Sequence, residues 1–184
     1  MPAARRPSMA AALAGAALWW LASTAAAAPA PAEPVPIGQA LPDVTMSGLN
    51  GADRPLSSFR GRRLIINVWA SWCGPCRAEA ASLERFAWSS AGAKYTVIGV
   101  STDDYRDAAQ RWLKQSNATL SHFIDRALVL ENLLGASRIP LTVLVDEQGR
   151  VVARVQGARE WDTAPLRELI EREYAAFVSA RRGR

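Results

Sequence analysis

The chain carries the stretch Leu64-Ile65-Ile66-Asn67-Val68-Trp69-Ala70-Ser71-Trp72-Cys73-Gly74-Pro75-Cys76, which joins an apolar run to its only two cysteines. The run 64–69 has the length and composition of a strand buried on both faces. A helix that opens at Cys73 would lower the pKa of this thiol through unpaired N–H groups and the helix dipole. Pro75 suits the first helical turn, and Gly74 leaves room for a partner to approach. The pattern predicts a thiol–disulfide redox site.

The two cysteines are expected to have different roles. Cys73 is predicted to be the nucleophile, and Cys76, one turn further into the helix and more buried, the resolving thiol that releases a mixed disulfide. A structural disulfide is an alternative, although so short a ring stabilises little. A zinc site is another, but two thiols and the single histidine, His122, are a poor ligand set. His122 is expected to be a surface or strand residue, and no cofactor or metal is predicted.

The composition of the chain limits its class. A length of 184 residues suits one domain with a terminal extension. The net charge of +5 comes mostly from arginine, with clusters near both ends and mixed signs between them. No nucleic-acid-binding motif accompanies this charge, so no nucleic-acid partner is expected.

The first 28 residues resemble a secretory signal peptide. Arg5 and Arg6 precede an apolar stretch, 9–21, and then a run of small residues, 22–28. An uncleaved membrane anchor is the alternative, because residues 9–30 contain almost no charge. Residues 29–40 are predicted to be a Pro/Ala-rich tether, and residues 41–184 the folded domain. Either form places the domain in the periplasm, secreted across the inner membrane or anchored to it, where disulfide chemistry is available.

The order of apolar and periodic segments predicts an α/β fold. Strand-like runs occupy residues 64–69, 95–100, 141–145 and 150–156, and a turn at 146–149 joins the last two. Helical periodicity follows the cysteines, returns after residue 105 with Asp103 or Asp104 as N-cap, and closes the chain from residue 162 or 163. A central mixed sheet flanked by helices is expected.

The stretch 67–76 resembles the active-site segment of thioredoxins. Further segments narrow the resemblance to the extracytoplasmic TlpA/ResA-like branch: the signal segment, Leu56-Ser57-Ser58-Phe59-Arg60-Gly61-Arg62, Glu79, Val97-Ile98-Gly99-Val100-Ser101-Thr102-Asp103-Asp104 and Arg138-Ile139-Pro140-Leu141-Thr142. The resemblance covers residues 41 to about 177. It implies a thioredoxin fold with a TlpA-like N-terminal extension and a central insertion that ends near Leu134.

The resemblance also implies roles for residues outside the cysteine pair. Pro140 would be a cis-proline that faces the cysteines, and the backbone of Ile139 would pair with an extended substrate segment. Trp72 would contribute an apolar docking surface, next to Gly74 and Pro75 between the cysteines.

Proton handling is a separate expectation. The buried Asp of thioredoxin aligns with Asn67, which cannot titrate. Cys76 and Glu79 lie three residues apart and share a helix face, so Glu79 is a candidate to handle the proton of Cys76. The alternative is a glutamate placed only by the helix dipole.

The resemblance implies a periplasmic thiol–disulfide oxidoreductase. The Gly-Pro pair between the cysteines resembles reducing members, so reduction of protein disulfides with electrons from an inner-membrane thiol donor is expected. Apocytochrome c and copper-site assembly proteins are the substrates the family implies. A disulfide-forming oxidase and an assembly factor that holds copper or a client protein are the alternatives.

Overall fold

The computed structural model describes residues 33–183. The predicted signal peptide or anchor, residues 1–28, and the start of the predicted tether lie outside the described residues. Within that described part, no helix has both the length and the apolar composition needed to cross a bilayer.

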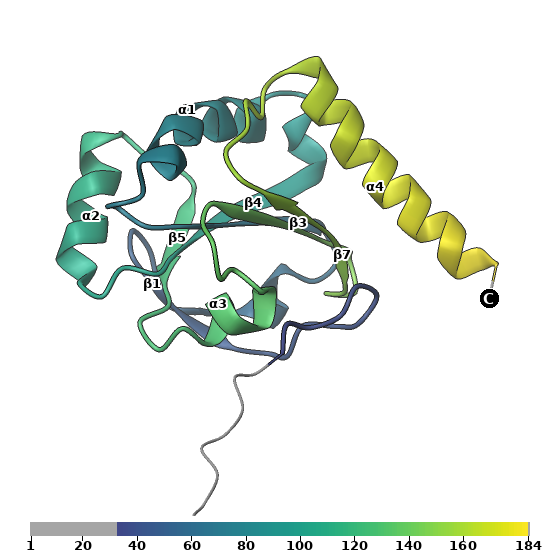
Figure 1. The fold of residues 1–184 in the computed structure, drawn as a ribbon, viewed down its shortest axis with the longest axis horizontal. Helices are drawn as coiled ribbons and strands as arrows, with labels where there is room; N and C mark the ends of the chain where they lie inside the picture. The colour runs from purple at the N-terminus through teal and green to yellow at the C-terminus, as the bar shows by residue number, and fades with distance from the viewer. Residues whose placement is uncertain (1–32, 184) are drawn as a thin grey trace, which may run out of the picture. The chain divides into compact units, whose positions relative to one another are not determined.

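A mixed seven-stranded sheet is the framework of residues 33–183 (Figure 1), with the strand order β2-β1-β5-β4-β3-β6-β7. The strands are β1 (Thr45–Gly48), β2 (Arg54–Pro55), β3 (Arg63–Trp69), β4 (Tyr95–Ser101), β5 (Ser121–Ile124), β6 (Leu141–Val145) and β7 (Val151–Gln156). Strand β3 is central, because it pairs in parallel with β4 and antiparallel with β6. The four predicted strands are therefore confirmed to within one residue at each end.

Helices cover both faces of this sheet. They are α1 (Gly74–Trp88), α2 (Arg106–Gln115), α3 (Val129–Leu134) and α4 (Ala164–Arg182), with 3-10 helices η1 (Leu56–Phe59) and η2 (Gly92–Lys94). In Figure 1, α1 and α4 lie on one side of the sheet and α3 lies on the other. The predicted α/β class is confirmed. Elements β1, β2 and η1 precede β3, and α2, β5 and α3 lie between β4 and Leu134, where the central insertion is expected to end.

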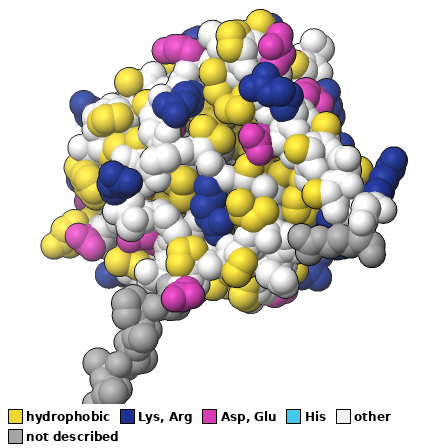
Figure 2. All heavy atoms as spheres, turned by 45° about the vertical axis from the view of Figure 1, so that its right-hand side comes forward, with side chains coloured by type: hydrophobic (Ala, Val, Ile, Leu, Met, Phe, Trp, Pro, Cys, Tyr) yellow, Lys and Arg dark blue, Asp and Glu magenta, His cyan; other side chains and the backbone are white. Residues whose placement is uncertain are grey.

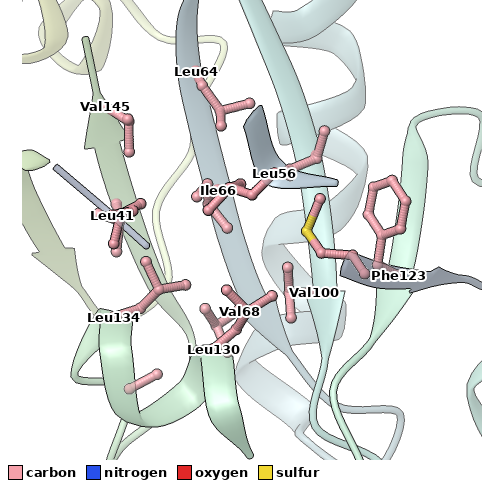
Figure 3. Packing of buried hydrophobic residues seen from close by; sticks show 14 of the residues in the cluster. Leu41, Leu56, Leu64, Ile66, Val68, Val100, Phe123, Leu130, Leu134 and Val145 are labelled. Carbon is pink, nitrogen blue, oxygen red and sulfur yellow. The ribbon is translucent and has the colours of Figure 1, made fainter. Parts of the chain in front are cut away.

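Strand β3 is held on both faces by apolar packing. Leu64, Ile66 and Val68 enter one cluster with residues of η1 and α3 (Figure 3). Ile65 points to the opposite face and packs with residues of α1 and α4. Each such side chain stabilises the fold by about 1.5–3 kcal/mol relative to its exposed state. The end of β3, where the cysteine segment begins, therefore has a fixed position.

The packed domain begins earlier than the expected boundary at residue 41. The backbone N–H of Val35 donates to Leu133 O at 2.9 Å, and that of Gly38 donates to Val151 O at 2.8 Å. Ala40 forms an antiparallel bridge with Arg150. Because β7 is an edge strand, its unpaired backbone groups offer partners to this segment. The second part of the expected tether, from Val35 onward, is therefore part of the domain.

The charges of the domain are mixed in sign. On the face that Figure 2 shows, Lys and Arg side chains are interspersed with Asp and Glu side chains. This arrangement agrees with a basic net charge that is not concentrated into one binding patch on that face.

Candidate active site

The cysteine pair lies at the start of α1, directly after the turn that leaves β3. Cys73 is the N-cap residue of α1, and the backbone N–H of Cys76 donates to Cys73 Sγ at 3.2 Å. Pro75 lies in the first turn, where the missing N–H leaves no hydrogen bond unmade. The two cysteines form a disulfide with their Cα atoms 5.3 Å apart. The predicted position of the thiol pair at a helix N-terminus is therefore present in the structure.

Burial alone does not separate the roles of the two cysteines. Cys73 is 5% exposed and Cys76 is 3% exposed, so the expected difference in burial is small in the disulfide form. Their surroundings differ more. The residues on either side of Cys73, Trp72 and Gly74, are exposed, whereas Cys76 lines a cavity together with Trp69 and other side chains.

The residues expected to bind substrate form a partly exposed surface around Cys73. Trp72 is 71% exposed, and Gly74 and Pro75 are also exposed. Ile139 is half-buried and packs against the cluster that contains both cysteines. The Ile139–Pro140 peptide bond is cis, and Pro140 is buried. The structure thus brings all four predicted substrate-binding positions to the neighbourhood of Cys73.

Glu79 is buried inside the domain on the second turn of α1. One carboxylate oxygen accepts a hydrogen bond from Asn67 Nδ2 at 2.7 Å. The other accepts from Arg159 N and from Trp161 Nε1, both at 3.0 Å. Burial raises the pKa of Glu79 above its usual value, and the bond from Asn67 is the largest effect in the opposite direction. The carboxyl group of Glu79 is therefore buried and hydrogen-bonded, and it does not face solvent.

Two features of the site lay outside the sequence-based prediction. Asp103, expected as a possible N-cap, does not cap α2, whose N-cap is Tyr105 without a side-chain bond. Its carboxylate instead binds Ser71, in the turn before Cys73. The expectation that His122 lies in a strand is correct, but its burial was not anticipated. Gly99 within a strand-like run was the available signal, because such a glycine often marks a close approach.

Metal binding receives no support within residues 33–183. No group of three or more His, Cys, Asp and Glu side chains in this part is arranged to hold an ion. Both sulfur atoms are joined in the disulfide. The Cys73–Cys76 disulfide at the start of α1 is suited to thiol–disulfide exchange.

Comparisons with known proteins also indicate thiol–disulfide exchange. The profile of the Redoxin family matches residues 36–170. The thiol:disulfide interchange protein DsbE of Vibrio cholerae is 34% identical over 148 residues, which cover 76% of this chain and 78% of that protein. The thiol-disulfide oxidoreductase ResA of Geobacillus thermodenitrificans is 25% identical over 123 residues, 67% of this chain and 71% of ResA. A solved structure from Chlorobium tepidum, described as a thiol:disulfide interchange protein DsbE, superposes with a TM-score of 0.67 at 25% identity, covering 78% of this chain and 98% of that one.

Proposed function

The chain belongs to the Redoxin family and is a thiol–disulfide oxidoreductase of the ResA/DsbE type with a thioredoxin fold, and from that premise we propose that it reduces disulfide bonds in protein substrates. The observation that carries the proposal is the position of Cys73 as N-cap of α1, with the N–H of Cys76 directed at its sulfur. This environment stabilises a thiolate, which is the reactive form.

The reaction proceeds in two exchanges. In the reduced protein, the Cys73 thiolate attacks one sulfur of the substrate disulfide, and the other substrate sulfur leaves as a thiolate. Cys76 then loses its proton and attacks Cys73 Sγ. The bond between Cys73 and substrate breaks, the substrate leaves as a second thiolate, and the Cys73–Cys76 disulfide forms. Two electrons pass from the protein to the substrate, whose thiolates take protons from solvent.

Substrate recognition uses the surface around Cys73. The exposed ring of Trp72 supports apolar docking, and Gly74 offers no side chain that would obstruct an approaching polypeptide. The half-buried Ile139, beside the cis-Pro140, supports backbone pairing with an extended substrate segment.

Glu79 takes part in proton handling during the attack by Cys76. Its burial and its raised pKa support this role, since the protonated and ionised forms are closer in free energy near neutral pH than in an exposed glutamate. The neighbouring Asn67 donates to it at 2.7 Å and cannot itself titrate.

The cellular setting follows from the N-terminal sequence. The signal-like residues 1–28 support a position in the periplasm, secreted or tethered to the inner membrane. There an inner-membrane thiol donor would regenerate the dithiol. The Gly74-Pro75 pair supports the reducing direction, and apocytochrome c and copper-site assembly proteins are the substrate classes that the family resemblance supports.

The reduction potential of the full chain tests the direction of electron flow. Trp69 and Trp72 flank the disulfide and provide a fluorescence signal during equilibration with thiol buffers of known potential. A potential near that of thioredoxin, about −270 mV, is expected for a reductase. A value near that of a strong oxidant, about −120 mV, would instead assign the protein to disulfide formation.

A further inference from the structure

A cavity of about 250 Å³ lies beneath α1, on the face of the sheet that α1 and α2 cover. Its floor is formed by Asn67 and Trp69 of β3 and His122 of β5, and Cys76 lines it from α1. Exposed residues at its edge, Arg77 and Ser116, place its opening between α1 and the segment after α2. The cavity therefore connects solvent with the buried side of the resolving cysteine.

The strand register explains why His122 and Trp69 meet at the floor of this cavity. Asn67 lies opposite Gly99 on the neighbouring strand β4, and Gly99 lies opposite His122 on β5. Directly paired residues of neighbouring strands point to the same face of a sheet. Gly99 has no side chain, so the rings of His122 and Trp69 lie over its backbone. A Cβ atom at Gly99 would collide with His122 Nδ1 and lie 2.8 Å from Trp69 Nε1.

Buried polar atoms without hydrogen-bond partners in the described part of the chain belong to two residues that line this cavity. His122 is 8% exposed, and neither of its ring nitrogens has a hydrogen-bond partner within residues 33–183. Trp69 Nε1, which belongs to a ring 5.4 Å from the imidazole, is in the same situation. Buried groups of this kind are normally satisfied by protein or by ordered water. The lining of the cavity is mostly apolar but includes the polar side chains of Asn67, Glu84 and Ser116, and its volume is large enough for several water molecules.

We propose that water in this cavity links His122 to Cys76 Sγ, and that His122 is a second acceptor for the proton that Cys76 loses when it resolves the mixed disulfide. The inference rests on the proposed role of Cys76 as resolving thiol. The proton passes from the Cys76 thiol through water to an imidazole nitrogen. The S–S bond between Cys76 and Cys73 forms, the bond between Cys73 and substrate breaks, and the substrate thiolate takes a proton from solvent. His122 then returns its proton to solvent through the opening of the cavity.

The charges near His122 act against the effect of its burial. Burial lowers the pKa of His122 to about 4, so the ring is neutral at neutral pH and, from burial alone, a weak base. Among the residues that line the cavity, the charged or titratable groups come from α1: Cys76, Arg77 and Glu84. Glu84 favours the protonated imidazole, and a thiolate forming on Cys76 would favour it further. The lining residues from β3, β5 and the segment 112–120 contribute no other titratable side chain.

Glu79 and His122 would serve the same step from two sides. Asn67 lies between them, with Nδ2 donating to Glu79 and the cavity on its other side. His122 acts on Cys76 through water and does not contact the reacting sulfur atoms, so its role is that of a positioning residue. With two acceptors available, loss of one leaves the other in place, and a partial effect on rate is expected.

Stopped-flow kinetics of the full chain provide the first test. The reduced protein is mixed with a symmetric aromatic disulfide that releases one coloured thiolate on attack by Cys73 and a second on resolution by Cys76. His122→Gln should slow the second release about threefold to tenfold near pH 7, without slowing the first. Near pH 10 the difference should disappear, because the Cys76 thiolate then forms without an acceptor. Ser116→Ala, which changes the same cavity without removing a titratable group, should follow the wild-type pH profile.

Nuclear magnetic resonance of the wild-type chain gives a second test that needs no variant at His122. The chain has one histidine, so protein produced without a histidine tag has a single set of imidazole signals. In the reduced protein these signals should shift as Cys76 titrates. The shift should persist in Cys73→Ser and disappear in Cys76→Ser.

The outcomes separate this inference from the proposed function. An equal slowing of the second release by His122→Gln at every pH would show a structural role only and would overturn the inference. So would imidazole signals that ignore the titration of Cys76. If Cys76→Ser failed to trap the mixed disulfide on Cys73, the proposed function itself would be wrong.

Discussion

Ser71 and Asp103 are joined by two hydrogen bonds that connect the turn before Cys73 to the end of β4. The backbone N–H of Ser71 donates to Asp103 Oδ2 at 2.9 Å, and its hydroxyl donates to Oδ1 at 2.6 Å. Ser101 Oγ also donates to Oδ2, at 2.7 Å. Asp103 is 2% exposed, so these bonds replace the water that its carboxylate loses on folding.

Asp103→Ala should therefore destabilise the protein. It leaves the Ser71 and Ser101 donors without their acceptor, and each unsatisfied buried group costs about 1–3 kcal/mol. Urea denaturation of the oxidised protein measures the loss in the free energy of unfolding. Asp104→Ala is the matched control, because Asp104 is exposed and the bond it accepts from Arg126 uses its backbone oxygen. Equal stability of the two variants would contradict the role assigned to Asp103.

Trp72→Ala should weaken activity on a protein substrate while leaving stability nearly unchanged. The side chain is 71% exposed beside Cys73, so its removal should change the free energy of unfolding little. The exposed ring offers a large apolar area for contact with a partner. The expected result is a KM about tenfold higher for a folded protein disulfide, with little change for a small disulfide. Steady-state kinetics with both substrates measure this difference.

Trp88 provides the control for that experiment. It is 72% exposed, and it ends α1 at the opposite end from Cys73. Trp88→Ala should leave the KM for the protein substrate unchanged. An equal rise in KM for both variants would mean that the loss of an exposed tryptophan, and not docking at Trp72, is responsible.

The sequence predicted those strands that are marked by a long apolar run, and it missed strands that are short or polar. Strand β3 is a run of seven residues with an apolar majority, and the cysteine segment follows it directly. By contrast, β5 has the four residues Ser121–Ile124, two of them polar, and neither length nor composition marks it as a strand.

The contacts of the site depend on residues far apart in the chain. An acidic residue just before a helix suggested that Asp103 caps α2, but the helix has no such cap. Asp103 instead accepts hydrogen bonds from Ser71, 32 residues earlier in the chain. The carboxylate of Glu79 accepts a hydrogen bond from Trp161, which lies 82 residues later in the chain. The burial of His122 depends on the absence of a side chain at Gly99 and on packing against the ring of Trp69. Sequence patterns therefore located the two thiols but could not predict the long-range contacts that surround them.

Glu79 should make the folded protein less stable as pH rises. Its pKa is raised in the folded state, so the folded protein binds more protons than the unfolded chain at pH values between the two pKa values. The contribution of Glu79 is complete below the unfolded pKa and is lost as pH rises through the folded pKa. Glu79→Gln should remove this slope from the free energy of unfolding above about pH 4.5. An identical slope in the variant and the wild type would show that Glu79 has an ordinary pKa.

The same variant tests proton handling. Glu79→Gln should change the pH profile of the second exchange, in which Cys76 attacks, and leave the first exchange by Cys73 unchanged. Stopped-flow measurement of both steps makes the comparison within one experiment. An unaltered profile for the attack by Cys76 would remove Glu79 from the proposed mechanism.

His122 should have the opposite effect on stability. Burial lowers its pKa to about 4 from the usual 6.5, so the unfolded chain binds more protons between these values. The stabilisation is complete above the unfolded pKa and is lost as pH falls through the folded pKa. A shift of this size corresponds to about 3 kcal/mol. Urea titrations from about pH 7 to about pH 4 should show this loss in wild type and not in His122→Gln, measured as the difference between them. Because both proteins keep Glu79, its contribution cancels in that difference, and a constant difference across the range would mean that the imidazole is not held neutral by burial.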